Sequence, residues 1–232
     1  MPGLLKFMTC GSVDDGKSTL IGRLLYDAKL LYTDQVQKLE LESKVGSRAG
    51  NIDYSLLLDG LSAEREQGIT IDVAYRYFNT ENRSFIVADT PGHEQYTRNM
   101  AVGASFADLA ILLVDATQGI LTQTKRHLRI SSLMGIRHFV LAVNKMDLVD
   151  YKESAYAQIK ESFENIIESF NYESLHVIPV SATEGDNIKL ISTKMSWYPG
   201  PTLFKLLETI DVSKYDRITD FIMPVQRVAR PD

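Results

Sequence analysis

The first residues along the chain whose types and spacing indicate chemistry are residues 11–18. They read Gly-Ser-Val-Asp-Asp-Gly-Lys-Ser, which matches the phosphate-loop pattern G-x-x-x-x-G-K-[ST] between an expected strand and an expected helix. Glycines let the backbone curl so that successive N–H groups point at phosphate oxygens, and the helix N-terminus adds positive potential. Lys17 supplies a point charge for the β- and γ-phosphates, and the Ser18 hydroxyl is a ligand for Mg²⁺. We therefore expect a nucleotide to bind along this loop: Gly11, Ser12, Val13, Asp14, Asp15, Gly16, Lys17, Ser18 and Thr19.

A carboxylate that can share the magnesium ion follows a second apolar run. Asp89 ends the stretch Ser-Phe-Ile-Val-Ala-Asp and begins an Asp-Thr-Pro-Gly turn. The Asp89 carboxylate is expected to bind Mg²⁺ together with the phosphates, and the turn would bring the Gly92 N–H to a γ-phosphate. An aspartate at a strand end is common, so this prediction depends on the phosphate loop as its context.

The sequence Asn-Lys-Met-Asp at residues 144–147 indicates which base is bound. The Asp147 carboxylate can accept hydrogen bonds from the ring N–H and the exocyclic amine of guanine, a donor pair that adenine does not present on that edge. Leaving this carboxylate unpaired in a desolvated pocket costs ~1 to 3 kcal/mol or more, which excludes adenine. Asn144 can brace neighbouring loops, and the Lys145 stem can lie along the base or ribose. Backbone N–H groups near the guanine carbonyl are expected from Ser181, Ala182 and Thr183. The predicted ligand is GTP with Mg²⁺.

Alternating strands and helices must position these residues. Short apolar runs alternate with amphipathic stretches of helix length, which is typical of strand-helix-strand units around a mainly parallel sheet. Strands are expected at residues 4–9, 71–78, 85–89, 110–115, 139–144 and 177–180. Helices are expected at residues 17–26, around 95–100, and at 122–134, 152–170 and 202–210. The predicted fold is α/β, a three-layer P-loop GTPase domain with a mostly parallel six-stranded sheet. Apolar and polar residues alternate in 71–78, so that strand is expected nearer the sheet edge.

Two segments do not fit this alternation. Residues 33–70 are polar and form a long connection without a strong sheet pattern, and segments of that length in compact domains are usually functional or mobile. Residues 221–228 read as a new strand without a partner in this chain. We therefore expect a nucleotide-binding domain at 1–212, and at 213–232 a linker and the first strand of a second, β-rich domain. The whole protein is expected to be longer.

Composition limits the kinds of partner and the location. The formal net charge is −5, which argues against a generic binder of nucleic-acid backbones because such binding depends on clustered Lys and Arg. A single cysteine, Cys10, cannot form an internal disulfide, and no stretch reaches the roughly 18 apolar residues of a membrane helix. We expect a cytoplasmic protein with no membrane or nucleic-acid partner.

The motifs together resemble those of the translation-factor class of GTPases. Asp-Thr-Pro-Gly-His at residues 89–93 is the form typical of that class, and Gly-Ile-Thr at 68–70 resembles its switch I motif. The resemblance covers residues 1–232. It implies that 33–70 is a long switch I segment, that Thr70 closes onto Mg²⁺ and the γ-phosphate, and that 213–232 begin a truncated β-barrel. The implied metal ligands are then Ser18, Thr70 and Asp89.

Two positions of the phosphate loop narrow the resemblance. Elongation factors of this class usually carry His at its second and fifth positions, where this chain has Ser12 and Asp15. The chain resembles the GTPase subunits of bacterial ATP sulfurylases at these two positions and in two longer stretches: Leu-Ile-Gly-Arg-Leu-Leu-Tyr-Asp at 20–27 and Glu-Arg-Glu-Gln-Gly-Ile-Thr-Ile-Asp-Val-Ala-Tyr-Arg at 64–76. Such subunits also occur fused to adenylylsulfate kinase. The resemblance implies a hetero-oligomer in sulfate assimilation, where GTP hydrolysis drives adenylyl transfer from ATP to sulfate on a separate catalytic subunit. Composition and spacing show nothing of sulfate chemistry.

His93 is the candidate catalytic residue. It takes the place of the water-positioning glutamine of small GTPases, although a surface histidine beside a loop is the plainer alternative. By resemblance, Val13 and Ile69 form an apolar gate that keeps His93 away until a partner acts. Asp14 can coordinate a monovalent cation beside the phosphates. No arginine is an obvious finger. Arg65, in the 33–70 segment, could serve as one, although a helix-surface arginine is the plainer interpretation, so slow intrinsic turnover is expected.

The remaining notable residues have plainer interpretations. Cys10 is expected to pack at the end of its strand, and Trp197 to act as an aromatic anchor before the last helix. Structural roles are expected for His127, His138 and His176. The three leucines at 56–58 leave two interpretations open, docking on the core or forming a partner surface.

Two other functions stay open. One is an elongation-factor-like GTPase that delivers an RNA ligand, against which the net charge, Ser12 and Asp15 argue. The other is a nucleotide-gated interaction module without hydrolysis, against which His93 and the complete set of motifs argue.

Overall fold

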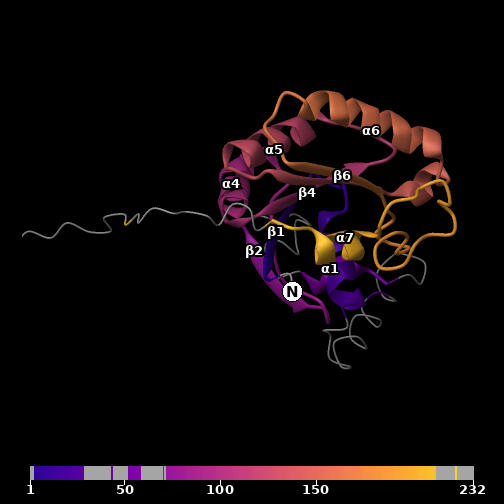
Figure 1. Ribbon diagram of the computed structural model, residues 1–232, viewed down its shortest axis with the longest axis horizontal. Helices are drawn as coiled ribbons and strands as arrows, with labels where there is room; N and C mark the ends of the chain where they lie inside the picture. The colour runs from indigo at the N-terminus through magenta and orange to yellow at the C-terminus, as the bar shows by residue number, and fades with distance from the viewer. Residues whose placement is uncertain are drawn as a thin grey trace, which may run out of the picture.

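A single sheet organises the part of the chain that the computed structural model describes, which is residues 3–28, 43, 52–58, 70, 72–212 and 223. Six strands of these residues pair in the order β2-β3-β1-β4-β5-β6 (Figure 1). They are β1 (Leu5–Cys10), β2 (Ala74–Asn79), β3 (Ser84–Asp89), β4 (Leu109–Asp115), β5 (His138–Asn144) and β6 (Ser174–Pro179). All neighbouring pairs are parallel except β2 and β3, which are antiparallel. The mostly parallel sheet and the edge position of its second strand confirm the sequence prediction.

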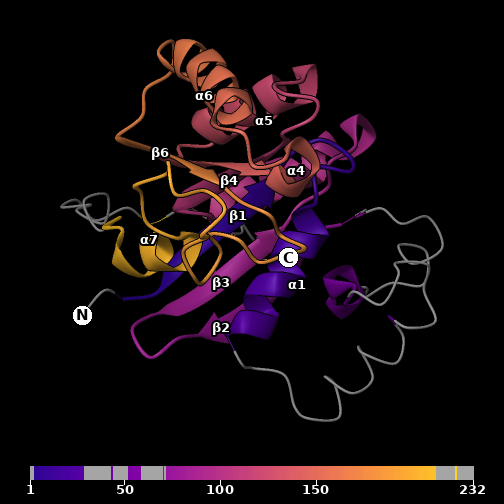
Figure 2. The same cartoon turned by 90° about the vertical axis from the view of Figure 1, so that its right-hand side faces the viewer.

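Helices cover both faces of this sheet, giving the three predicted layers (Figures 1 and 2). One face carries α1 (Lys17–Asp27) and α7 (Leu203–Thr209). The other face carries α4 (Thr97–Phe106), α5 (Thr122–Leu133) and α6 (Glu153–Ile167). Short 3₁₀ turns lie at η1 (Tyr54–Leu57), η2 (Glu94–Tyr96) and η3 (Met146–Val149). None of the helices in the described ranges is long and apolar enough to cross a bilayer.

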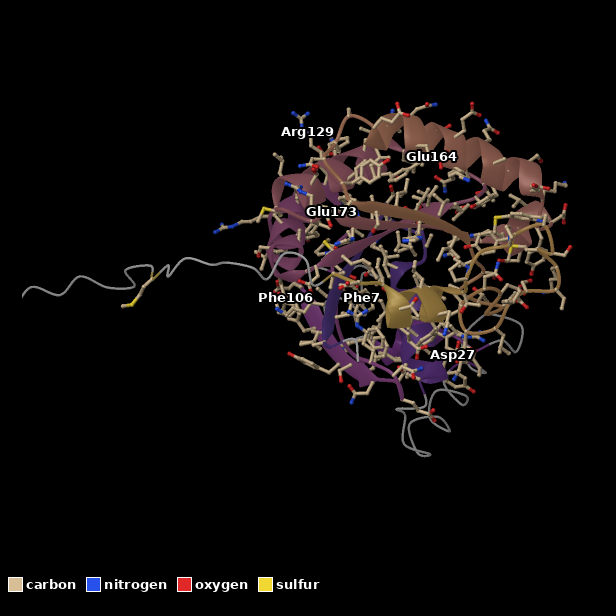
Figure 3. The ribbon with its side chains drawn as sticks, viewed as in Figure 1. Phe7, Asp27, Phe106, Arg129, Glu164 and Glu173 are labelled. Carbon is tan, nitrogen blue, oxygen red and sulfur yellow. The ribbon has the colours of Figure 1, made fainter. Side chains whose placement is uncertain are left out.

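The strand β4 supplies both hydrophobic cores. All its residues are buried, and because side chains alternate across a strand, Leu109 and Ile111 pack toward α1 and α7 while Ala110 and Leu112 pack toward α4, α5 and α6. This explains why its sequence reads as one continuous apolar run. On the outer side of α6, Glu164 is exposed to solvent (Figure 3).

Some element boundaries differ from the predictions. The strand predicted at 177–180 begins earlier, at Ser174, because its parallel pairing with β5 continues past the apolar run, and the Ser174 hydroxyl lies 2.8 Å from His138 Nδ1. The strand predicted from residue 71 begins at Ala74, where the antiparallel pairing opposite Asp89 starts. The helix predicted at 95–100 instead spans α4, since a 3₁₀ turn occupies Glu94–Tyr96.

Several expectations concern the ends and the long connection. Ile69, Arg65 and the strand expected at 221–228 lie outside the described residues. Leu58 is buried in the core with α1, whereas residues 56 and 57 are half-buried. Cys10 is fully buried, and burial raises the pKa of its thiol to about 12, as expected of a packing residue.

Candidate nucleotide-binding site

The loops that carry the predicted site residues leave the sheet at one edge. The strands β1, β3, β4 and β5 are parallel, so their carboxyl ends lie on the same side of the sheet. Thr9 pairs with Asp89 near the ends of β1 and β3, and Asp115 pairs with Asn144 at the ends of β4 and β5. In open α/β sheets, ligands bind outside the carboxyl ends of the strands. The residues that follow β1, β3 and β5 in the sequence are therefore brought to one place.

The phosphate loop turns into α1 at Gly16. Its φ of 91° is left-handed, and a Cβ there would lie 2.5 Å from Asn144 Nδ2, so glycine is required for both reasons. Val13 and Asp14 lie exposed on the loop, and Asp14 also has a left-handed φ of 67°. The loop has the curled backbone expected for a phosphate cradle at a helix N-terminus.

Lys17 places a buried positive charge inside the loop. Its ammonium donates to the carbonyl oxygens of Gly11 at 3.0 Å and Ser12 at 2.6 Å. Burial lowers the pKa of Lys17, while nearby Asp15 and Asp89 oppose the shift. The buried Ser12 hydroxyl has no hydrogen-bond partner among the described residues. A buried cation beside an unsatisfied hydroxyl fits an anionic group that brings its own oxygen acceptors, as a phosphate does.

The buried Asp15 side chain bridges the phosphate loop by a hydrogen bond to the backbone of Ser12. Its carboxylate accepts a hydrogen bond from the Ser12 N–H at 2.5 Å, and the residue is only 2% exposed. Burial raises the pKa of Asp15 despite the opposing charge of Lys17. One of the two positions that depart from the elongation-factor pattern is thus an internal brace of the loop.

The turn after β3 lies against Lys17. A Cβ on Gly92 would contact Lys17 Nζ and lie 2.9 Å from the Gly11 carbonyl oxygen, so this turn forms a second wall beside the ammonium. Asp89 is buried at the end of β3, and the Thr90 hydroxyl donates to the Thr9 carbonyl at 2.7 Å.

His93 follows this turn with extended backbone. The residue is half-buried, and its ring lies 6.4 Å from that of Tyr96 in an edge-to-face arrangement.

Asn144 joins two of the predicted loops. Its Nδ2 donates to the Asp15 carbonyl at 2.8 Å, and its Oδ1 accepts from the Ala182 N–H at 3.0 Å. The amide therefore ties the phosphate loop to the Ser-Ala-Thr segment after β6. The Ala182 N–H, one of three predicted to face a guanine carbonyl, is engaged by Asn144 in this structure.

Asp115 is a site residue that the sequence analysis did not single out. It accepts a hydrogen bond from Lys145 Nζ at 2.7 Å and two from the N–H and hydroxyl of Thr117. Burial opposes ionisation of Asp115, but these hydrogen bonds outweigh it and lower its pKa. The Lys145 stem is thereby fixed at the sheet edge, and the only sequence signal was an aspartate at the end of an expected strand.

Asp147 lies beside the segment after β6. The Ser181 hydroxyl donates to Asp147 Oδ1 at 2.6 Å, and Asp147 remains half-buried. The Thr183 carbonyl accepts from Arg23 Nη1 at 3.1 Å. Ser18 and Thr19, in the first turn of α1, are half-buried, as is Thr70.

These features define a class of protein. A phosphate loop between β1 and α1, an Asp-x-x-Gly turn after β3 and an Asn-Lys-x-Asp segment after β5, all at one sheet edge, are the parts of a P-loop GTPase fold. The chain belongs to the family described as the Elongation factor Tu GTP binding domain, which matches residues 3–214.

Relatives of similar sequence carry a more specific name. The chain is 58% identical over 232 residues to sulfate adenylyltransferase subunit 1 of Photorhabdus laumondii, covering 99% of this chain and 48% of that protein. It is 57% identical over 230 residues to sulfate adenylyltransferase subunit 1 of Colwellia psychrerythraea, covering 99% of this chain and 49% of that protein. The chain therefore spans about half the length of these relatives.

A solved structure shows the same fold. The Ski7 GTPase-like domain of S. cerevisiae, bound to GDP and inorganic phosphate, superposes with a TM-score of 0.77 at 21% identity. The match covers 89% of this chain and 49% of that one.

Proposed function

We propose that the chain binds GTP with Mg²⁺ and hydrolyses it to GDP and phosphate. The observation that carries this proposal is Asn144, whose amide bonds the Asp15 carbonyl and the Ala182 N–H together. A single side chain thereby holds the phosphate loop and the guanine-side segment at a fixed separation, as one nucleotide spanning both would require.

The phosphates of GTP are proposed to lie between the phosphate loop and the Gly92 turn. Lys17 leaves the carbonyls of Gly11 and Ser12 for the β- and γ-phosphate oxygens, because an ion pair in a desolvated site is stronger than its two present bonds. Mg²⁺, which neutralises charge on the phosphates when bound, is held by Ser18, Thr70 and Asp89.

The base lies beside η3 and the segment after β6. Asp147 accepts hydrogen bonds from the guanine ring N–H and amine, while Ser181 keeps the carboxylate oriented through its 2.6 Å hydrogen bond. Lys145, fixed by Asp115, flanks the base. Adenine would leave the Asp147 carboxylate without these donors, so GTP is preferred over ATP.

Hydrolysis requires a water in line with the γ-phosphate. His93 orients this water, and the bond between the γ-phosphorus and the bridging oxygen breaks as the water attacks. Val13 and Ile69 gate His93, and Asp14 faces a monovalent cation. Val13 is 39% exposed, which suits a residue that covers the approach path of His93 until a partner moves it aside.

The whole protein, in this proposal, couples GTP turnover to sulfate activation. The relatives named sulfate adenylyltransferase subunit 1 support this, since a subunit of that name implies a separate catalytic subunit that transfers the adenylyl group from ATP to sulfate. The alternative of an elongation-factor-like GTPase that delivers RNA is not favoured by these relatives.

Phosphate release tests the central claim. The purified chain with Mg²⁺ should release phosphate from GTP over hours and bind GDP far more tightly than ADP, whereas Lys17→Ala should lose both activities. Equal affinity for GDP and ADP would contradict guanine recognition. Binding without phosphate release above the Lys17→Ala background would support a nucleotide-gated module instead.

A further inference from the structure

The segment that carries Asp147 is held in a disfavoured backbone conformation. Among the described residues, five that are not glycine have positive φ, and three of them flank Asp147: Lys145 at 62°, Asp150 at 53° and Tyr151 at 56°. Residues with a Cβ rarely adopt this region, and they persist there only where surrounding contacts hold them. Something outside residues 145–151 must therefore keep this segment in place.

The contacts that hold it come from residues 194 and 197. The indole N–H of Trp197 donates to the Tyr151 carbonyl oxygen at 3.0 Å. The ammonium of Lys194 donates to the Tyr151 hydroxyl at 2.9 Å and lies 4.7 Å from the centre of its ring. Within the segment, the Tyr151 N–H donates to the Met146 carbonyl at 2.8 Å. The backbone carbonyl and the side chain of Tyr151 are thus both held by the loop after β6.

The indole of Trp197 packs against two tyrosine rings. Its ring lies 5.1 Å from that of Tyr156 on α6 and 6.4 Å from that of Tyr198. The Tyr156 hydroxyl donates in turn to the Val177 carbonyl on β6 at 2.9 Å. Trp197 therefore transmits the position of α6 and the sheet to the Tyr151 carbonyl.

The loop after β6 also contacts Asp147, through Asp186 and Ser181. The Lys194 ammonium lies 3.3 Å from Asp186 Oδ2, and the Asp186 carbonyl accepts from the Ser181 N–H at 3.2 Å. The Ser181 hydroxyl then donates to the Asp147 carboxylate. Polar contacts therefore connect Tyr151 to Asp147 through Lys194, Asp186 and Ser181, and both ends of this connection lie in the 145–151 segment.

We propose that Trp197 and Lys194 are positioning residues for base recognition, which hold the Asp147 carboxylate against the amine of guanine. This inference rests on the proposed binding of a guanine nucleotide. Neither residue touches the base. They act by restricting the 145–151 segment, so their loss lets the carboxylate move away from the geometry that two simultaneous hydrogen bonds require.

The inference is tested by comparing GDP with inosine diphosphate, which lacks the exocyclic amine. Trp197→Phe keeps an aromatic ring against Tyr156 but removes the indole donor, and Lys194→Met keeps the stem but removes the ammonium. The dissociation constant of inosine diphosphate divided by that of GDP should fall about threefold to tenfold in either variant, which is the range for losing one well-oriented hydrogen bond.

Two matched controls should leave this ratio unchanged. Tyr198→Phe removes a hydroxyl that donates to the Pro201 carbonyl, so it takes one hydrogen bond from the same aromatic cluster without affecting Tyr151. Lys205→Met removes an exposed ammonium on α7. Trp197 is the single tryptophan of the chain, so its emission maximum checks that the cluster survives in Lys194→Met.

The outcomes separate this inference from the proposed function. If the unmodified chain fails to prefer GDP over ADP, the proposed function is wrong and the positioning role falls with it. If the chain prefers GDP but Lys194→Met and Trp197→Phe weaken GDP and inosine diphosphate equally, the two residues only stabilise the fold and the positioning role is overturned.

Discussion

Asn144 Nδ2 donates to the carbonyl oxygen of Asp15 at 2.8 Å, although the two residues are separated by 129 positions in the chain. The phosphate loop is therefore braced by the side chain that also fixes the Ala182 N–H. Both bonds are buried, so each would leave an unsatisfied group if the amide were removed.

Asn144→Ala should lower the free energy of unfolding by about 3 kcal/mol, because two buried hydrogen bonds are lost and the Ala182 N–H is left unsatisfied. Urea denaturation measures this directly. GDP affinity should fall as well, since the loops on both sides of the proposed nucleotide site lose a common brace. The exposed Asn165→Ala on α6 serves as the control. A change no larger than that of Asn165→Ala would contradict the bracing role.

Gly92→Ala should weaken binding of GTP more than binding of GDP. The added methyl group would contact Lys17 Nζ and push the ammonium away from the proposed γ-phosphate position. A charge-assisted hydrogen bond is worth more than ~1.4 kcal/mol, so GTP should lose at least about tenfold relative to GDP. Gly3→Ala, where the added methyl group meets open space, is the control, and isothermal titration of both nucleotides provides the measurement. Equal losses of affinity for GTP and GDP would contradict the proposal that the Gly92 turn lies beside the γ-phosphate.

The sheet and the phosphate loop were predictable from local patterns. Buried parallel strands give continuous apolar runs, as β4 does, and the loop needs glycine at a left-handed position, which Gly16 occupies. The contacts that complete the site could not be read in this way. Lys145 pairs with Asp115 and Trp197 with the Tyr151 carbonyl across long stretches of chain, so no short-range spacing marks either pair.

Boundaries were less predictable than the elements themselves. The strand β6 starts at Ser174 because pairing with β5 continues beyond the apolar residues, and tertiary pairing of that kind leaves no mark in hydrophobicity. The helix α4 continues past Met100 because Met100 and Ala104, one turn apart, both pack on the sheet. Strand pairing decided the start of β6 and burial decided the length of α4.

Asp15→Asn should stabilise the free chain at neutral pH. Burial raises the pKa of Asp15 in the folded state above its unfolded value, so the folded state binds more protons between the two values and loses stability as pH rises through them. Asparagine keeps an acceptor for the Ser12 N–H without the buried charge. The stability difference between variant and parent should shrink as pH falls toward the unfolded pKa of about 4. Thermal melting across this range provides the measurement, and a constant difference would show that ionisation of Asp15 is not responsible.

His93→Ala should leave GTP affinity near that of the parent while lowering single-turnover hydrolysis by about 10² or more, because an oriented water is lost but no ground-state contact is. His93→Gln is the informative companion, since an amide can also orient a water and should retain more turnover than alanine. Parallel losses of affinity and turnover in His93→Ala would assign His93 to the structure of the turn.

A catalytic subunit should accelerate GTP hydrolysis by the full-length protein. In the described residues around the Gly92 turn, His93 is half-buried and Val13 is exposed, which leaves room for a partner to rearrange both. Partners that stabilise charge on the transferred phosphoryl group raise turnover by as much as ~10³ to 10⁵. Titrating a candidate ATP sulfurylase catalytic subunit into the full-length protein should raise phosphate release, and GTP should stimulate formation of adenylylsulfate in the same mixture. The Lys17→Ala protein should show neither effect. A rate of GTP hydrolysis that stays constant across the titration would contradict the coupling to sulfate activation. It would not contradict nucleotide binding by the chain.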